Sequence, residues 1–511
     1  MEPKVGNLRL MLEEVAKNYG AKTAVVSGER RLSYAELDEA SNKVANALMG
    51  VGVGRGDRVA MLLTNSPEFV IIYFGIVKIG GIAVPLDVKY KIDELASLFD
   101  DSQPKVLVAE SPLLELLAPA LPRFKYIESV IGVGPHNEGK FLSYQQIIAT
   151  GSAGRIEVEL AGDDVAHIGY TSGPTTNPRG AMLTHRSLVA ETAISAYGFQ
   201  QTDKDIAVLF ALPMHHVFGL VGILLTAIYK GSTVVTVSGL SISSVLEIME
   251  RRRSTIFMGV PYVYNLMVNA AEKDGIRSNL SSLRLCGSAG APLPPDIAKR
   301  FKKHFGRDII DFWGLTEATC HITCPPLDGT GRLGSVGKAL PGWEIKIVDD
   351  NGRELVVNEP GEIIARGAIM KGYYNNPQAT AEVIKDGWLY TGDIGRVDED
   401  GYLYILGRKK DTIIRKGQNI YPADIEVVLS AHPKVAEVVV VGIADEMRGE
   451  IVRACLVFKE GEVATEEEMR HFCRQHMADY KLPKQILFLP SLPKTAAGEI
   501  YKEALKDIPL P

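Results

Sequence analysis

The sequence is poor in cysteine, with five in 511 residues. So few thiols make no disulfide framework, which indicates free thiols in a reducing compartment. Cys320 and Cys324 are spaced like one half of a metal site, but no second pair follows them. A structural zinc site is therefore not expected.

Long hydrophobic runs are also missing. The most apolar stretch, residues 69–77, is interrupted by Lys78 and then by Gly80, Gly81 and Pro85. It is too short to cross a bilayer. The first 20 residues have mixed charge and the pattern of an amphipathic helix, without the apolar core of a signal peptide. We therefore expect a cytoplasmic protein with no integral membrane segment.

The chain has no excess of positive charge. Its 56 basic and 62 acidic side chains give a net charge of −6. A general nucleic-acid binder is usually more basic, so no nucleic-acid partner is expected and any polyanion must be held by a local site. Hydrophobic residues make up 46% of the chain, as in globular proteins. The length predicts two or more domains.

Helical and apolar strand patterns alternate along most of the chain. Residues 34–49 and 68–79 are predicted helices, and residues 58–63 and 81–86 are predicted strands. Further strands are expected at 105–109, 165–170, 206–212 and 232–237. This alternation predicts an α/β fold with parallel-rich sheets covered by helices.

The pattern changes after about residue 340. Short strands are expected at 344–348, 361–366, 392–397 and 402–406, separated by Asp-Asp-Asn-Gly and Asp-Glu-Asp-Gly turns. These features predict hairpins in a β-rich subdomain.

A compact α+β pattern follows, with helices at 423–431 and 466–475 and strands at 435–443 and 451–459. The predicted division is a large domain over 1–406, a hinge over 407–411 and a small domain over 412–511.

The most informative segment is Ile-Gly-Tyr-Thr-Ser-Gly-Pro-Thr-Thr-Asn-Pro-Arg-Gly, residues 168–180. An apolar strand ends at Tyr170 and opens into hydroxyl side chains, glycines and the cation Arg179. Such a loop suits phosphate binding, although an ordinary polar turn has a similar composition. It is not a Walker loop, because Gly-Lys-Ser/Thr is absent.

This tract closely resembles the phosphate loop of the adenylate-forming superfamily, Tyr-Thr-Ser-Gly-Thr-Thr-Gly-x-Pro-Lys-Gly. Three more segments resemble motifs of that family, in the family's order: Trp313-Gly314-Leu315-Thr316-Glu317, Trp388-Leu389-Tyr390-Thr391-Gly392-Asp393, and Gly407-Arg408-Lys409-Lys410-Asp411 continuing through Lys416-Gly417 to residues 421–426. The resemblance covers nearly the whole chain and is strongest to acyl-CoA synthetases.

The resemblance implies a two-step reaction. A carboxylate attacks the α-phosphate of Mg-ATP to give an acyl-adenylate and pyrophosphate, and coenzyme A then takes the acyl group and releases AMP. The small domain rotates between the two steps. ATP, Mg²⁺ and coenzyme A are thus the implied cofactors, and a small carboxylic acid is the implied substrate. Whether the protein is a monomer or a homodimer stays open.

The resemblance also implies roles for individual residues. Arg179 takes the place of the family's usual lysine, Trp313 stacks on adenine and Asp393 accepts the ribose hydroxyls. Glu317 and Thr171 are the implied Mg²⁺ ligands. The full implied nucleotide set is Thr171, Ser172, Gly173, Thr175, Thr176, Arg179, Gly287, Ala289, Asp311, Trp313, Gly314, Thr316, Asp393 and Arg408.

On the acyl side, Pro-Met-His-His-Val-Phe-Gly over 213–219 resembles the family's Pro-x-x-His-x-x-Gly segment. This places His216 at the mouth of an acyl pocket with Val217, Gly219 and Gly290, although a buried structural histidine is an alternative. No acidic residue lies between positions 207 and 229 to hold a substrate ammonium group. A simple fatty or aryl acid is therefore expected, of unspecified length.

The small domain supplies further implied residues. Lys410 occupies the hinge position, and Lys416 with Gly417 resembles the pair that faces the site during thioester formation. Lys416 is alternatively a solvated loop lysine. The implied catalytic set is Glu499, Lys416, His216, Thr316 and Glu317.

Glu499 departs from the family pattern. The family ends in Pro-Lys-Thr-x-x-Gly-Lys, and its late lysine bridges the acid and the α-phosphate, whereas this chain has Glu499 there. One pair of unit charges about 4 Å apart is worth roughly 4 kcal/mol at an effective dielectric constant of about 20. Losing that much from the transition state slows adenylation by about a thousandfold.

The phosphate loop departs from the pattern as well. Pro174 removes a backbone N–H that could bind phosphate, and Thr176 replaces a glycine. Two hypotheses follow. The chain is a synthetase with impaired adenylation, with Lys494 and Lys502 as candidate substitutes for the missing lysine, or it is a catalytically silent homologue that binds adenylate or acyl-CoA.

Overall fold

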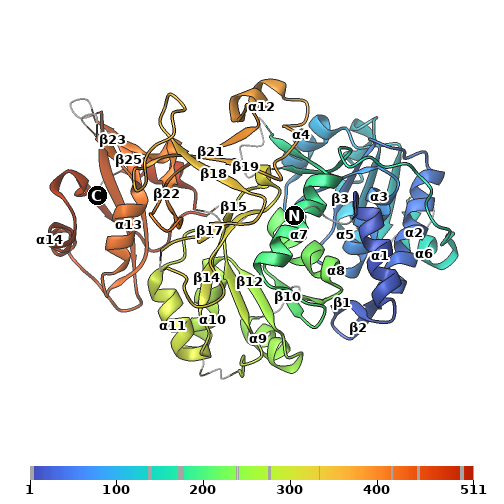
Figure 1. Cartoon of the computed structure of the whole chain (residues 1–511), viewed down its shortest axis with the longest axis horizontal. Helices are drawn as coiled ribbons and strands as arrows, with labels where there is room; N and C mark the ends of the chain where they lie inside the picture. The colour runs from blue at the N-terminus through green and yellow to red at the C-terminus, as the bar shows by residue number, and fades with distance from the viewer. Residues whose placement is uncertain are drawn as a thin grey trace.

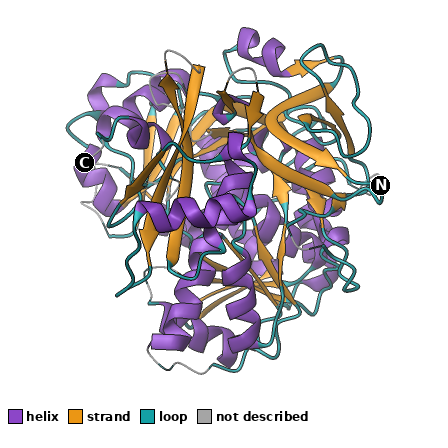
Figure 2. Ribbon diagram, turned by 90° about the vertical axis from the view of Figure 1, so that its left-hand side faces the viewer, coloured by secondary structure: helices purple, strands orange, loops and turns teal. Residues whose placement is uncertain are grey.

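The computed structural model describes residues 5–135, 141–170, 178–237, 239, 241–273, 275, 278–332, 334–415, 418–445, 449–494 and 500–509. In Figure 1 the N-terminal helices occupy one end of the long axis and the C-terminal elements the other. Figure 2 shows the strands gathered into sheets with helices packed around them. No described helix is both long and apolar enough to cross a membrane.

One large sheet has seven strands in the order β7-β6-β5-β3-β4-β8-β9. Its strands are β3 (Arg58–Leu62), β4 (Ile82–Pro85), β5 (Val106–Glu110), β6 (Ser129–Val133), β7 (Leu142–Ser143), β8 (Val165–Tyr170) and β9 (Gly180–Thr184). All neighbours are parallel except β8 and β9, which are antiparallel. The helices of this part are α1 (Leu8–Tyr19), α2 (Tyr34–Gly50), α3 (Pro67–Lys78), α4 (Ile92–Ser102), α5 (Ser111–Leu117) and α6 (Tyr144–Thr150).

A second seven-stranded sheet follows the order β14-β13-β12-β10-β11-β1-β2 and is parallel except for the β1–β2 hairpin. Its strands are β1 (Thr23–Ser27), β2 (Arg30–Ser33), β10 (Ile206–Phe210), β11 (Thr233–Val237), β12 (Ile256–Gly259), β13 (Leu285–Ser288) and β14 (Ile309–Asp311). The helices that follow β9 along the chain are α7 (His185–Gly198), the π-helix η2 (Phe218–Leu225), α8 (Thr226–Lys230), α9 (Ile242–Arg251), α10 (Pro261–Lys273) and α11 (Pro295–Phe305). The predicted α/β class with parallel-rich sheets is confirmed.

Local sequence explains where the first helices begin. Ser33 caps α2 and forms a reciprocal capping box with Glu36. Ser66 caps α3, whose first residue is Pro67, a position where proline loses no helical hydrogen bond. Every residue of α3 except Glu68 is buried, including Lys78. This helix thus lies in the largest hydrophobic core of the protein.

The predicted β-rich subdomain is present. It contains β15 (Trp313–Gly314), β16 (His321–Cys324), β17 (Lys338–Ala339), β18 (Glu344–Val348), β19 (Gly361–Arg366), α12 (Pro377–Val383), β20 (Ile384–Lys385), β21 (Trp388–Val397) and β22 (Leu403–Arg408). Its strand pairs are antiparallel, as the turn sequences predict. Strand β21 begins four residues before the predicted start at 392, because Trp388 and Leu389 pair with β20 and β19.

Residues from 413 onward form the last sheet, with β23 (Ile413–Arg415), β24 (Gln418–Ile420), β25 (Val435–Asp445), β26 (Gly449–Phe458) and β27 (Gln485–Phe488). Helices α13 (Pro422–Ser430) and α15 (Lys502–Lys506) contact β25, and α14 (Glu466–His476) packs on α13. The two hydrophobic clusters of this region draw all their residues from position 413 onward. We call this unit the lid and the rest the body. The exact division at 407–411 stays a prediction.

Candidate active site

A hydrogen-bonded group of three side chains joins the β-rich strands. The indole Nε1–H of Trp313 donates to Oδ2 of Asp393 over 2.9 Å, and Nε of Arg408 lies 2.8 Å from Oδ1 of the same carboxylate. Asp393 and Arg408 face each other across the β21–β22 pair. Burial raises the pKa of Asp393, against the opposing effect of Arg408. The fold thus brings together three implied nucleotide residues from motifs up to 95 positions apart in the sequence.

Glu317 lies beside this group, close enough for its charge to act on Asp393. The Tyr373 hydroxyl donates to Oε1 of Glu317 over 2.7 Å, and the Met370 amide donates to the Glu317 backbone carbonyl over 2.7 Å. The Arg179 guanidinium lies 5.6 Å from the centre of the Tyr373 ring, a cation–π contact. Tyr373 therefore links the implied metal ligand to the implied phosphate cation.

The described ends of the phosphate loop converge on the same place. A Cβ built on Gly169, two residues before the loop, would lie 3.1 Å from Cγ2 of the buried Thr316. After the loop, Gly180 accepts a hydrogen bond from the Tyr374 amide over 2.7 Å. Both ends thus adjoin the Glu317–Tyr373 pair.

Several predicted residues lie outside the described part of the chain, so the structure places none of them. They are Thr171, Ser172, Gly173, Pro174, Thr175, Thr176, Lys416, Gly417 and Glu499. Their roles stay predictions.

The implied adenine side is formed by the ends of β13 and β14. Asp311 ends β14, and the Leu293 amide donates to its Oδ2 over 3.4 Å. Burial raises the pKa of Asp311 to about 7. Gly287 and Ala289 are buried in and after β13. At Gly314 a Cβ would lie 1.8 Å from the Cys320 carbonyl oxygen, so only glycine fits this strand pairing.

The implied acyl side lies at the start of the π-helix. His216 is exposed, whereas Val217 and Gly219 are buried. The alternative that His216 is a buried structural histidine is therefore wrong. A Cβ on Gly219 would lie 2.4 Å from the Pro213 carbonyl oxygen. Gly290 has φ of +85° and faces Val260, at the end of β12.

In the lid and hinge, Lys410 is exposed within the 3-10 turn η4 (Lys409–Asp411). The two candidate substitutes for the missing lysine are both engaged. Nζ of Lys502 lies 3.0 Å from Asp411. Nζ of Lys494 lies 3.1 Å from Glu437 and 5.0 Å from the ring centre of Tyr262, at the start of α10. Lys494 thus contacts α10 of the body, whereas Lys502 contacts the turn η4, just before the lid begins.

Sequence analysis did not identify Tyr373 or Phe312. Tyr373 lies outside all four motifs, and only the packing of residues 370–374 on β9 and Glu317 brings it into the site. Phe312 directly precedes the Trp313 motif, so a motif did point to this part of the chain. The contacts of its ring, however, could not be predicted from the sequence.

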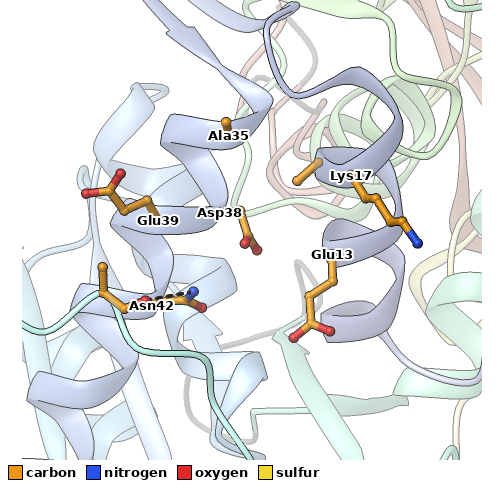
Figure 3. A pocket seen from close by; sticks show the side chains of 8 residues that line it. Glu13, Lys17, Ala35, Asp38, Glu39 and Asn42 are labelled. Atoms are coloured by element: carbon orange, nitrogen blue, oxygen red, sulfur yellow. Dashed lines mark hydrogen bonds between the residues drawn. The ribbon is translucent and has the colours of Figure 1, made fainter.

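A separate cleft of about 370 Å³ lies between α1 and α2 (Figure 3). Carboxylates of Glu13, Asp38 and Glu39 line it together with Lys17. It shares no residue with the groups above, so it is not part of the candidate active site.

Comparisons with known proteins match one enzyme family over nearly the whole chain. The family model described as AMP-binding enzyme matches residues 12–374, and the model described as AMP-binding enzyme C-terminal domain matches 424–499. The "Long-chain-fatty-acid--CoA ligase" of Bacillus subtilis is 32% identical, covering 98% of this chain and 94% of its own.

Two solved structures are similar in fold as well as sequence. ATP-bound MatB from Rhodopseudomonas palustris is 31% identical with a TM-score of 0.90, covering 98% of each chain. The anthranilate CoA ligase AuaEII in complex with anthranoyl-AMP is 30% identical with a TM-score of 0.89, covering 98% of this chain and 96% of its own.

Proposed function

The chain belongs to the AMP-binding enzyme family, and from this premise we propose that it is an AMP-forming acid–thiol ligase of the acyl-CoA synthetase type. It activates a fatty or aryl carboxylic acid with ATP and transfers the acyl group to coenzyme A. Relatives named as long-chain fatty acid and anthranilate CoA ligases support this reaction class.

The observation that carries the proposal is the Trp313–Asp393–Arg408 group. Asp393 is a buried carboxylate held by an indole N–H and a guanidinium, and each carboxylate oxygen retains a lone pair for another donor. Two neighbouring hydroxyls, as on a ribose, suit these acceptors. Arg408 is half-exposed and can also donate to an adenylate phosphate.

In the first step, a carboxylate oxygen of the acid attacks the α-phosphorus and pyrophosphate leaves. Arg179 is placed beside Tyr373 to bind the departing phosphate oxygens. Tyr373 orients Glu317 by donating to Oε1.

Glu317 fits Mg²⁺, which takes one or two carboxylates with phosphate oxygens and water, and Thr171 is its second predicted ligand. The ion would neutralise phosphate charge when bound. Among the described residues no larger cluster of His, Cys, Asp and Glu competes as a metal site.

In the second step, the thiol sulfur of coenzyme A attacks the acyl carbon, AMP leaves and the thiol proton is released. Lys416 and Gly417 are proposed to face the site at this stage, and the turn containing Lys410 is proposed as the hinge of the lid. His216, exposed at the start of the acyl side, is proposed to border the adenylate.

We propose further that Glu499 impairs the first step, because it replaces the expected cation with an anion. Pyrophosphate exchange with a panel of acids tests this in the native protein and in Glu499→Lys. The lysine variant should exchange at least a hundredfold faster, given the roughly 4 kcal/mol of one charge pair. Glu503→Lys is the matched control, since Glu503 is exposed, lies four positions further along the chain and undergoes the same charge change.

The alternative is an adenylate- or acyl-CoA-binding protein without turnover, and the same departure at position 499 favours it. No exchange in either form, with AMP still bound, would establish this alternative and sink the ligase proposal. If the native protein exchanges as fast as Glu499→Lys, the proposed impairment is wrong.

A further inference from the structure

Four aromatic side chains form a closed cluster in the body: Phe199, Phe218, Phe312 and His321. Ring centres are 5.1 Å apart for Phe199 and Phe312, 5.2 Å for Phe199 and His321, 5.5 Å for Phe218 and His321, and 5.6 Å for Phe312 and His321. None of the four is more than 5% exposed. We call this group the ring cluster.

The ring cluster connects the two edges of the proposed acyl site. Phe218 begins the π-helix two residues after His216, and its amide donates to Nδ1 of His216 over 3.3 Å. Phe312 lies on the other edge. A Cβ built on Gly287 would be only 2.2 Å from the Phe312 ring, so the ring occupies the space beside that glycine. The rings therefore fill the interior directly behind both edges.

The π-helix and β16 also pack closely against each other beside the ring cluster. A Cβ on Gly222, within the π-helix, would lie 2.6 Å from Cε1 of His321 and 3.2 Å from Phe218. The Cys320 thiol also contacts this helix, 3.5 Å from the Val217 carbonyl oxygen. Such close packing leaves no room for an acyl chain to pass between the π-helix and β16 unless a ring moves.

A buried hydrogen-bond network holds the ring cluster in place. Nδ1 of His321 lies 3.0 Å from the Ser195 hydroxyl, which donates to Oε1 of Glu191 over 2.9 Å. The same oxygen accepts from the His321 amide over 3.0 Å, and Oε2 accepts from the Trp343 indole over 3.1 Å. Turning the His321 ring aside would break these buried bonds, so the cluster is a rigid wall.

We propose that the ring cluster is the floor of a shallow acyl pocket, and that the substrate is a compact acid, either short-chain or with a single ring. Phe312 is the specificity-determining residue, because it lies between β14 and β15, directly before Trp313, and fills the space next to Gly287. This proposal rests on the proposed function, since it assumes that an acyl group is bound between His216 and the 287–290 loop.

Non-hydrolysable acyl-sulfamoyl adenosines test the pocket without turnover, so an impaired first step does not affect the comparison between acyl groups. Affinities are measured by calorimetry for AMP and for analogues carrying acetyl, butanoyl, benzoyl, octanoyl and hexadecanoyl groups. The native protein should bind the butanoyl or benzoyl analogue best and the octanoyl analogue at least tenfold more weakly, as expected when a pocket rejects extra methylenes. The hexadecanoyl analogue should bind no better than AMP.

Phe312→Ala should improve octanoyl binding at least tenfold while the acetyl analogue changes by less than threefold. Phe312→Leu, a smaller change, replaces it if the alanine variant does not fold, with an intermediate shift. Phe301→Ala is the matched control, because Phe301 is equally buried but packs in a different hydrophobic cluster. Its acyl preference should equal that of the native protein.

The outcomes separate the two proposals. If the native protein binds the hexadecanoyl analogue as tightly as the butanoyl one, the compact-acid inference is overturned and the proposed function stands. An unchanged acyl preference in Phe312→Ala and Phe312→Leu overturns the role of Phe312. If AMP binds but no acyl analogue binds more tightly than AMP, the proposed function itself falls.

Discussion

Glu191 is a fully buried carboxyl group that accepts hydrogen bonds from Ser195, the His321 amide and Trp343. Burial outweighs these three bonds and raises the pKa of Glu191 to about 8. The pKa of His321 is lowered to about 3 by burial, so its ring is neutral. The protonation state of Glu191 thus determines whether this part of the core carries a charge.

The stability of the body should fall as pH rises from the ordinary pKa of a glutamate toward about 8. A carboxyl whose pKa is higher folded than unfolded takes up a proton on folding, so its contribution is complete below the unfolded value and is lost as pH approaches about 8. The loss is at most about 1.4 kcal/mol per pH unit. In urea titrations, the unfolding free energy of the native protein should therefore decrease from pH 5 to pH 8 relative to that of Glu191→Gln.

Glu157→Gln is the control for this titration, because Glu157 is exposed and a surface substitution of this kind should change the unfolding free energy by no more than about 0.5 kcal/mol at any pH. A pH-independent difference for Glu191→Gln as well would mean that Glu191 is ionised in the folded protein throughout.

At the scale of residues, the sequence predicted the site where a motif fixes both type and spacing. Trp313, Asp393 and Arg408 were assigned from separate motifs and are in contact. Tyr373 and Phe312 were missed because their importance depends on which side chains they touch. The partners of Asp393 were also not predictable, because Arg408 meets it through the register of β21 against β22 and Trp313 reaches it from β15, which belongs to another sheet.

Helix α3 shows how one element is tied to its neighbour. Its last residue, Lys78, has no exposed side-chain surface, and its Nζ lies 2.6 Å from both Asp38 and Asn42 on α2. Burial lowers the pKa of Lys78, whereas Asp38 raises it. Desolvation of such a cation is tolerated only because these oxygen atoms surround it.

Lys78→Ala should therefore destabilise the body by about 3 kcal/mol, because it leaves a cavity and deprives two oxygen atoms of their donor. Urea unfolding monitored on the body measures this change. Lys43→Ala is the matched control, since Lys43 forms an i,i+4 pair with the largely exposed Glu39 and should change stability by less than about 0.5 kcal/mol. Equal effects of the two substitutions would contradict this account of α3.

Among the elements, the helices and strands that periodicity predicted lie within a few residues of their predicted bounds. Many others were not predicted, and two of them show why. The antiparallel strand β9 was not foreseen, because Gly-Ala-Met-Leu-Thr is compatible with several structures and its pairing with β8 depends on the intervening loop. The π-helix η2 is apolar in every residue, so its sequence has no polar face from which a helical period could be read.

At the scale of the whole molecule, the lid has hydrophobic clusters of its own, separate from those of the body. The contacts between lid and body include the Lys273–Glu460 ion pair and the Lys494–Tyr262 cation–π contact. Both involve exposed or half-exposed side chains, which contribute little to stability. The two units should therefore unfold with limited cooperativity.

Calorimetry should show two transitions. AMP should raise the transition of the body, where Trp313 and Asp393 lie, because a ligand stabilises the unit that binds it. Ile425→Ala should lower only the lid transition by several degrees, since Ile425 is fully buried in the lid core. One transition that moves with both AMP and Ile425→Ala would show that the units unfold together.

All five cysteines are buried, and burial raises the pKa of each thiol, to about 11 for Cys455 and Cys473 and about 12 for Cys286 and Cys324. Few of these thiols are ionised at neutral pH, so the folded protein should react only slowly with disulfide reagents. The enzyme proposed to handle a thiol substrate therefore exposes no competing thiol of its own. Consumption of coenzyme A can accordingly be followed by thiol titration in the presence of the folded protein, with little background from it.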